Sequence, residues 1–199
     1  SISTLVSTVL GAMLGILLYR FRFPLKGTYE GMVHLPIVIP EVCMGVALLA
    51  FFAAIKMPLG LTTITVSHIA FTIPFVAVVI RARMAGFDRS LEEAACDLGA
   101  GQWQVMRDIT LPYLKPGLIA GAMLAFTLSL DDFVITFFTS GPGSTTFPIK
   151  IYSMVRFSVT PEVNAASTLL IVLTLGLTVV AMWVQSRGDG GAGARKEGA

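Results

Sequence analysis

The chain has 199 residues, of which 55% are hydrophobic and only 13% are charged. Soluble domains usually carry about 25% charged residues, so this balance excludes an ordinary soluble protein and indicates an integral membrane protein. The net charge of +2 is small, and no basic cluster is interleaved with aromatic residues, which argues against nucleic-acid binding.

Five segments are apolar enough and long enough to cross a bilayer, which takes about 20 residues. Only helices satisfy their own backbone groups in lipid, so all five are predicted to be helices. The second segment is interrupted by Pro36, Pro40 and Glu41, and the fourth carries Asp131 and Asp132 near its end. The five segments are residues 2–19, 32–55, 61–80, 116–138 and 165–184.

The two ends of the chain differ in character. Ser1 opens directly into an apolar run with no charged segment or cleavage site before it, so we expect an N-terminally truncated chain whose first helix is missing. Residues 1–186 form the expected transmembrane domain, and the Gly-rich, polar tail 187–199 is expected to be disordered. One side of the predicted membrane domain collects eleven of the 14 Lys and Arg residues, which places residues 81–115 and the C-terminus in the cytoplasm.

Residues 90–112, SLEEAACDLGAGQWQVMRDITLP, form a polar stretch between apolar segments. Ser90 and Glu93 have the spacing of a capping box, and Gly99 suits a left-handed helix end. The pattern predicts a short helix, a sharp turn, a second short helix over about residues 102–109, and re-entry into the membrane at Pro112. The face shared by the apolar positions consists of Leu91, Ala94, Ala95 and Leu98.

Two interpretations of the first short helix are open from periodicity alone. Its slim alanine face could fit a groove on another protein, or the helix could lie on lipid headgroups. The acidic residues Glu92, Glu93 and Asp97 weaken the second interpretation, because the cytoplasmic leaflet is itself negative.

The stretch resembles the cytoplasmic signature of ABC importer permeases, E-A-A, three residues, G, nine residues, I, one residue, L-P. The matching residues are Glu93, Ala94, Ala95, Gly99, Ile109, Leu111 and Pro112. The runs SLDDFVITFF and IKIYSMVRFSVTPEVNA extend the resemblance, in particular to the spermidine/putrescine permeases of the type I class.

The resemblance implies an all-α fold, with this chain supplying five of the six helices of a type I permease and a cytoplasmic coupling helix. That helix docks on a separate ATPase, which implies coupling roles for Glu92, Glu93, Ala94, Ala95, Leu98, Gly99, Ile109, Leu111 and Pro112. The implied partners are a second permease, two ATPase subunits, an external substrate-binding protein and membrane lipid, with no nucleic acid. The implied location is a bacterial inner membrane.

Acids inside a membrane are costly and are candidates for function. We expect either Asp131 or Asp132 to line a translocation path and to attract the ammonium groups of a polyamine. The alternative is a structural acid that pairs with a neighbouring helix or caps a helix break. Glu41 has the same two interpretations, a helix restart after Pro40 or a place on a cation path.

Other function classes find less support in the sequence. No phosphate-binding loop of the form G-x-x-x-x-G-K-[ST] occurs, so ATP is expected to bind to a partner, and the chain itself is expected to hold no cofactor or metal and to be no enzyme. His34 and His68 are distant from each other in sequence, so no metal pair is expected, and His68 is expected to pack or to form hydrogen bonds within the membrane domain. A secondary carrier would need its own ion site and often an internal repeat. Iron, sulfate and molybdate remain alternative cargoes, since related permeases carry them.

Overall fold

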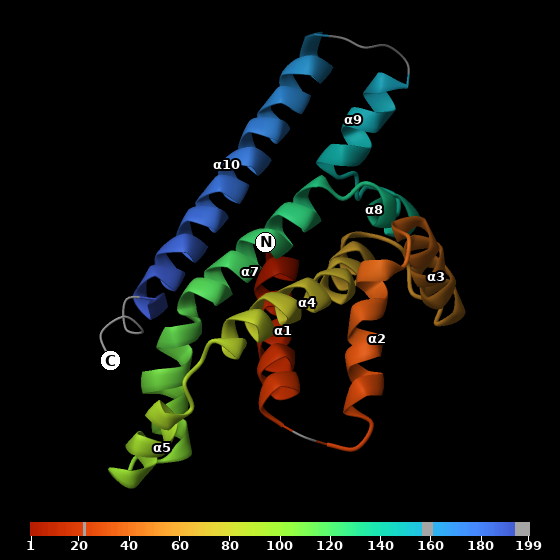
Figure 1. The fold of residues 1–199 in the computed structure, drawn as a ribbon. Helices are drawn as coiled ribbons and strands as arrows, with labels where there is room; N and C mark the ends of the chain where they lie inside the picture. The colour runs from red at the N-terminus through yellow and green to blue at the C-terminus, as the bar shows by residue number, and fades with distance from the viewer. Residues whose placement is uncertain (22, 157–160, 194–199) are drawn as a thin grey trace.

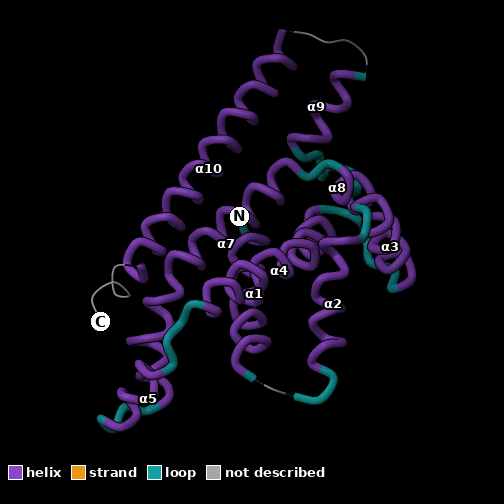
Figure 2. The backbone as a smooth tube through the Cα atoms, in the orientation of Figure 1, coloured by secondary structure: helices purple, strands orange, loops and turns teal. Residues whose placement is uncertain are grey.

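The computed structural model describes residues 1–21, 23–156 and 161–193, and every regular element within these ranges is a helix (Figures 1 and 2). The all-α prediction is therefore confirmed for the described residues. In chain order the helices are α1 Ile2–Arg20, α2 Lys26–Val38, α3 Glu41–Ala54, α4 Leu61–Ala85, α5 Ser90–Asp97, α6 Gln102–Val105, the π-helix η1 Met106–Thr110, α7 Leu111–Asp131, α8 Val134–Thr139, α9 Phe147–Val155 and α10 Pro161–Gly193.

Four helical stretches of the described chain are long and apolar enough to cross a membrane, and a fifth results if one bent pair is counted as a single span. The four are Ile2–Arg20, Leu61–Ala85, Gln102–Asp131 and Val163–Trp183. Their positions agree with four of the segments expected from the sequence. The short helix α9 lies in the connection between the last two spans.

The second expected span is not one continuous helix. It consists of α2 and α3, which are bent by 106° at Ile39 and Pro40. Pro40 has no N–H to donate, and Ile39 before it is extended, as steric contact with a following proline ring favours. Glu41 then begins α3, so the helix restart inferred from the sequence is confirmed.

The fourth expected span is also broken, and it begins earlier than predicted. The helical stretch begins at Gln102 rather than near residue 116, because α6, η1 and α7 follow one another without a break, and Pro112 therefore does not begin a separate helix. It ends at Asp131, since Asp132 is extended, and the short helix α8 follows in a new direction (Figure 2).

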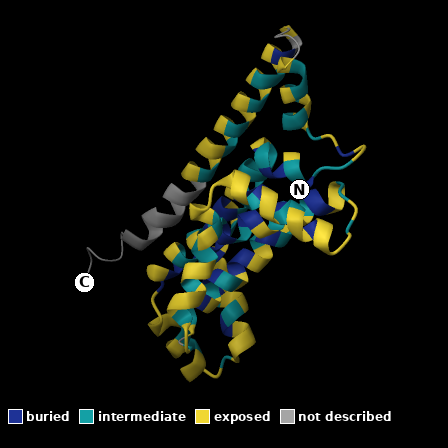
Figure 3. Cartoon of the chain, turned by 90° about the vertical axis from the view of Figure 1, so that its right-hand side faces the viewer, coloured by how far each residue is buried: buried dark blue, intermediate teal, exposed yellow. Residues whose placement is uncertain are grey.

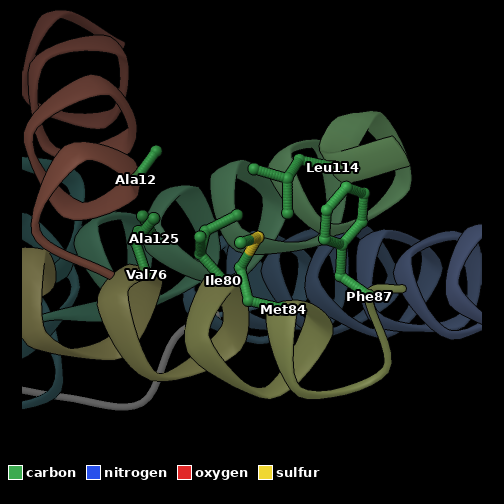
Figure 4. Packing of buried hydrophobic residues seen from close by; sticks show 7 residues of the cluster. All are labelled: Ala12, Val76, Ile80, Met84, Phe87, Leu114 and Ala125. Carbon is green, nitrogen blue, oxygen red and sulfur yellow. The ribbon is translucent and has the colours of Figure 1, made fainter. Parts of the chain in front are cut away.

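The core lies where α1, α4 and α7 pack against one another. Figure 4 shows the side chains that fill it, which come from these three helices and from the loop after α4. They are Ala12, Val76, Ile80, Met84, Phe87, Leu114 and Ala125. The cluster reaches from the middle of α1 towards the α4–α5 loop, so it ties the polar stretch to the membrane helices.

Two glycines allow α1 and α4 to approach closely. A Cβ atom on Gly11 would lie 2.6 Å from the Cβ of Val76, and one on Gly15 would lie 2.7 Å from the carbonyl oxygen of Ala77. The backbones therefore meet where a side chain of any other residue would not fit, which is the use of the GxxxG spacing in membrane helices.

The peripheral helices leave much apolar surface exposed. α10 runs beside α7, yet Leu169, Val172 and Val179 on it are exposed (Figures 1 and 3). A bilayer or a neighbouring subunit covers apolar surface of this extent. α10 continues to Gly193, beyond residue 187, where the sequence predicted a disordered tail; residues 194–199 lie outside the described residues.

Candidate functional site

The first polar helix, α5, begins at Ser90 as predicted, but its cap differs from the expected capping box. Ser90 is the first helical residue, so Arg89 occupies the N-cap position, and it makes no side-chain cap bond. Instead the carboxylate of Asp88 accepts a hydrogen bond from the backbone N–H of Ser90 at 2.9 Å. Hydrogen bonds from Ser90, first from its side chain and then from its backbone, hold the pKa of Asp88 below the usual value of 3.8.

The end of α5 has the geometry expected of a glycine stop. Gly99 has a φ of +85°, the left-handed conformation that glycine adopts without steric cost. Its N–H donates to the carbonyl of Cys96, and the N–H of Ala100 donates to that of Ala95. This pair of bonds is a Schellman motif, which turns the chain sharply into α6.

The signature residues divide into two groups by exposure. Glu93, Ala94, Leu98 and Gly99 are exposed, with Leu98 89% exposed. Ala95 is half-buried, and Ile109 packs against the core cluster. Leu111 and Pro112 are exposed in the first turn of α7. One surface of α5 is therefore exposed at one end of the molecule (Figure 1). Ile109, Leu111 and Pro112 connect residues 90–112 to the core and to α7.

Glu92 lies directly before the signature and was also given a coupling role, but its side chain faces the interior of the molecule. Its Oε2 forms an ion pair with Arg20 at the end of α1, and its Oε1 accepts a hydrogen bond of 2.6 Å from the Thr110 hydroxyl. Its side chain is only 13% exposed. We call these three residues the Arg20–Glu92–Thr110 bridge. Beside it a cavity of about 870 Å³ opens between α1 and the α5–α6 turn.

The two adjacent aspartates occupy different environments. Asp132 is buried, and its carboxylate accepts hydrogen bonds from the backbone N–H groups of Ile135 and Thr136 and from the Thr136 hydroxyl. It thereby caps α8 at the break after α7. His68 on α4 lies 3.2 Å from the same carboxylate, and its other ring nitrogen lies 2.6 Å from the Ser129 hydroxyl.

Asp131 and Glu41 are exposed, in contrast to Asp132. They approach each other because α3 packs on α8; a Cβ on Gly45 would lie 2.6 Å from the Phe138 ring. The three acids proposed from sequence are therefore brought together, two on accessible surface and one inside a hydrogen-bonded network.

The sequence did not indicate the partners of these acids. Arg20 and Thr110 are 72 and 18 positions from Glu92, and Ser129 and Thr136 are 61 and 68 positions from His68. No local pattern connects residues so far apart. His68 was expected to be a packing or hydrogen-bonding residue, and its contacts confirm that interpretation.

The arrangement of helices is similar to that in a solved ABC transporter. It is similar to an inward-facing structure of the MetNI methionine ABC transporter, with a TM-score of 0.70, 22% sequence identity, and coverage of 96% of this chain and 88% of that one. This likeness defines the fold as an ABC-transporter permease fold.

Residues 7–189 match the family described as binding-protein-dependent transport system inner membrane component, and the chain belongs to this family. It is 40% identical over 192 residues to the spermidine/putrescine transport system permease protein PotC of Shigella flexneri, across 95% of this chain and 73% of the relative. It is 41% identical over 190 residues to the putrescine transport system permease protein PotI of Escherichia coli K12, across 92% and 68%.

A less similar relative is named for a different cargo. The molybdenum transport system permease protein ModB of Escherichia coli K12 is 31% identical over 200 residues, across 92% of this chain and 86% of the relative. The resemblance to importer permeases inferred from the signature is thus confirmed. The chain is a multi-pass inner-membrane transport protein, and a transport permease is not an enzyme class.

Proposed function

We propose that this chain is the permease subunit of an ATP-driven importer and forms part of a translocation path for spermidine and putrescine. Alternating access, in which the path opens to one side of the membrane at a time, moves the cargo. The observation that carries this proposal is the identity of 40% and 41% to two permeases that are named for these polyamines. The chain itself catalyses no covalent reaction and holds no cofactor.

The acids near the α7–α8 break support a cationic cargo over an oxyanion. Glu41 at the start of α3 and Asp131 at the end of α7 are both exposed near the place where α3 packs on α8, and two carboxylates there form a negative site suited to ammonium groups. A molybdate ion would be repelled there, although a molybdenum permease is among the relatives. Asp131 and Glu41 are therefore the proposed cargo-path residues, whereas Asp132 supports the helix break.

The exposed surface of α5 is the proposed coupling element. Glu93, Ala94, Leu98 and Gly99 stand clear of the rest of the chain, and such a slim helix suits insertion into a groove on an ATPase. Ala95 supports this surface, and Ile109, Leu111 and Pro112 connect it to α7. ATP is bound and hydrolysed by that partner.

The complex proposed here contains a second permease, two ATPase subunits and an external binding protein. The excess of Lys and Arg on the α5 side favours a cytoplasmic position for α5 and for the C-terminus. The cargo acids near α8 then lie towards the outer side, where a binding protein delivers its ligand.

Ala94→Leu tests the coupling surface. The exposed position accommodates leucine without disturbing the fold, but the added side chain should prevent α5 from entering a partner groove. We expect the ATPase to co-purify with the wild-type chain and to be lost from the variant. Ala53→Leu, at an exposed position on α3, is the matched control and should retain the ATPase. Retention by both variants would contradict the proposed docking surface.

A further inference from the structure

We propose that Glu92 is a positioning residue that links α5 to both α1 and α7, so that a displacement of α5 moves these two membrane helices together. The inference rests on the proposed coupling function of α5. It assigns to Glu92 a role different from that of its neighbour Glu93, which is exposed and available to a partner.

The geometry of the bridge uses both carboxylate oxygens for different helices. Oε2 pairs with the guanidinium of Arg20, the last residue of α1, and Oε1 accepts the hydroxyl hydrogen of Thr110, the residue directly before α7. Thr110 is fully buried and the Glu92 side chain is nearly so. The Arg20 side chain is 28% exposed and lines the adjoining cavity together with Glu92, so the bridge is only partly buried. Charge-assisted hydrogen bonds are directional and favour one arrangement of their partners.

The other contacts of the polar stretch with the membrane helices come from residues beside α5, namely Phe87 in the core cluster and Arg89, whose guanidinium lies 5.6 Å from the centre of the Tyr19 ring. None of the residues of α5 is buried, and the cavity beside it is lined by Ile16, Arg20 and Phe21 on one side and by Glu93, Cys96 and Asp97 on the other. Apolar packing across this gap is therefore sparse. The Arg20–Glu92–Thr110 bridge crosses it and supplies the directional contact.

The helices at the two ends of the bridge belong to the rigid core. α1, α4 and α7 pack together through Ala12, Ile80 and Leu114 (Figure 4). The segment that bears Thr110 is a π-helix, a local irregularity that often accompanies functional sites. Within α5 itself, the Glu92 carboxylate therefore connects a movement of the helix to the core at the end of α1 and at the start of α7.

The test uses the full-length chain in its complete complex, reconstituted in vesicles with radiolabelled spermidine as the cargo. Two quantities are measured, the amount of ATPase bound and the uptake per ATP hydrolysed. Glu92→Gln and Arg20→Gln each remove one charge of the ion pair. The exchange variant, Arg20→Glu combined with Glu92→Arg, restores the ion pair with the charges reversed. The arginine at position 92 can still contact Thr110, because the Thr110 hydroxyl can accept a hydrogen bond as well as donate one. Asp108→Asn, which alters a carboxylate with a 68% exposed side chain, is the control.

We expect both single variants to bind the ATPase normally but to lose about tenfold in uptake per ATP hydrolysed, within the range seen for coupling residues. The exchange variant should recover most of the loss, and the control should behave as wild type. Wild-type uptake per ATP in the single variants would overturn the inference. Loss of the bound ATPase would also overturn it, because Glu92 would then be a docking residue.

A second pair of variants covers the case in which the charge changes prevent folding. Thr110→Ser retains the hydroxyl and Thr110→Val removes it, while both keep a small side chain. Uptake per ATP should be normal in the first and reduced in the second, and equal values would overturn the inference. Failure of the underlying function is distinguishable, since the wild-type complex itself would then show no ATP-dependent uptake.

Discussion

Adjacent residues of identical type can have different roles when the backbone turns between them. Asp131 ends α7 and is exposed, whereas Asp132 is extended, turns inward and accepts the free N–H groups at the start of α8. The sequence placed both acids near a helix end but left the choice between path and cap open. The contact with His68, 64 positions earlier in the chain, could not be inferred locally.

Substitution of each aspartate by asparagine should separate the two roles. Asp131→Asn should leave thermal stability unchanged but lower polyamine uptake by about tenfold or more, the loss expected for one charge-assisted contact. Asp132→Asn should instead lower the stability of the subunit by about 1–3 kcal/mol, because a single oxygen cannot replace the capping carboxylate. Thermal unfolding in detergent and uptake in cells measure the two effects. Wild-type uptake by both variants at normal expression would exclude a cargo role for either acid.

The cap at Asp88 predicts a pH dependence of the first turn of α5. Because its pKa is lower in the folded chain than the usual 3.8, its contribution is complete above that pH and is lost as the pH falls through the lower folded value. Amide exchange at Ser90 and Glu92, corrected for its intrinsic pH dependence, should accelerate in that range. Asp88→Ala should show fast exchange at neutral pH as well. Equal exchange in the variant and the wild type at neutral pH would show that Asp88 is no cap.

At the scale of the elements, the sequence predicted the spans better than their breaks. The lengths of the apolar segments identified α1, α4 and α10 directly. A helix that spans the bilayer needs about 20 apolar residues whatever its neighbours are. The prolines and Glu41 indicated the α2–α3 junction, but the angle of the bend, 106°, and the packing of α3 on α8 do not follow from the local sequence. The capping box at Ser90 failed because the Asp88 carboxylate supplied the cap in its place.

The close approach of α1 and α4 predicts that glycine-to-alanine substitution is destabilising at Gly15, which lies at this contact, but not at Gly31, which lies outside it. Gly15→Ala would place a Cβ 2.7 Å from a backbone carbonyl of α4, so the helices must separate, at a cost of about 1–3 kcal/mol. Gly31→Ala on α2 meets nothing within 4 Å and should be neutral or stabilising, because alanine favours the helix. Thermal unfolding of the two variants measures the difference. An unchanged or raised midpoint for Gly15→Ala would contradict the close approach.

At the scale of the whole molecule, the composition was enough to predict the fold class. The residues of the coupling site could be identified only from the signature together with the packing of the helices. High apolar content and five long segments were sufficient for the fold class. The exposed half of the signature was identifiable by its spacing, because a surface that meets a partner need not contact its own chain. Glu92 could not be distinguished from Glu93 by sequence, since only the packing of α1 against α7 brings Arg20 and Thr110 to one of them.

The most direct test of the proposed function is uptake of labelled spermidine and putrescine by the full-length subunit. The subunit is assembled with its second permease, ATPase and binding protein in a strain that lacks polyamine import. We predict ATP-dependent uptake that unlabelled polyamine competes away and molybdate does not. An intact complex with an active ATPase but no polyamine uptake would contradict the proposed cargo.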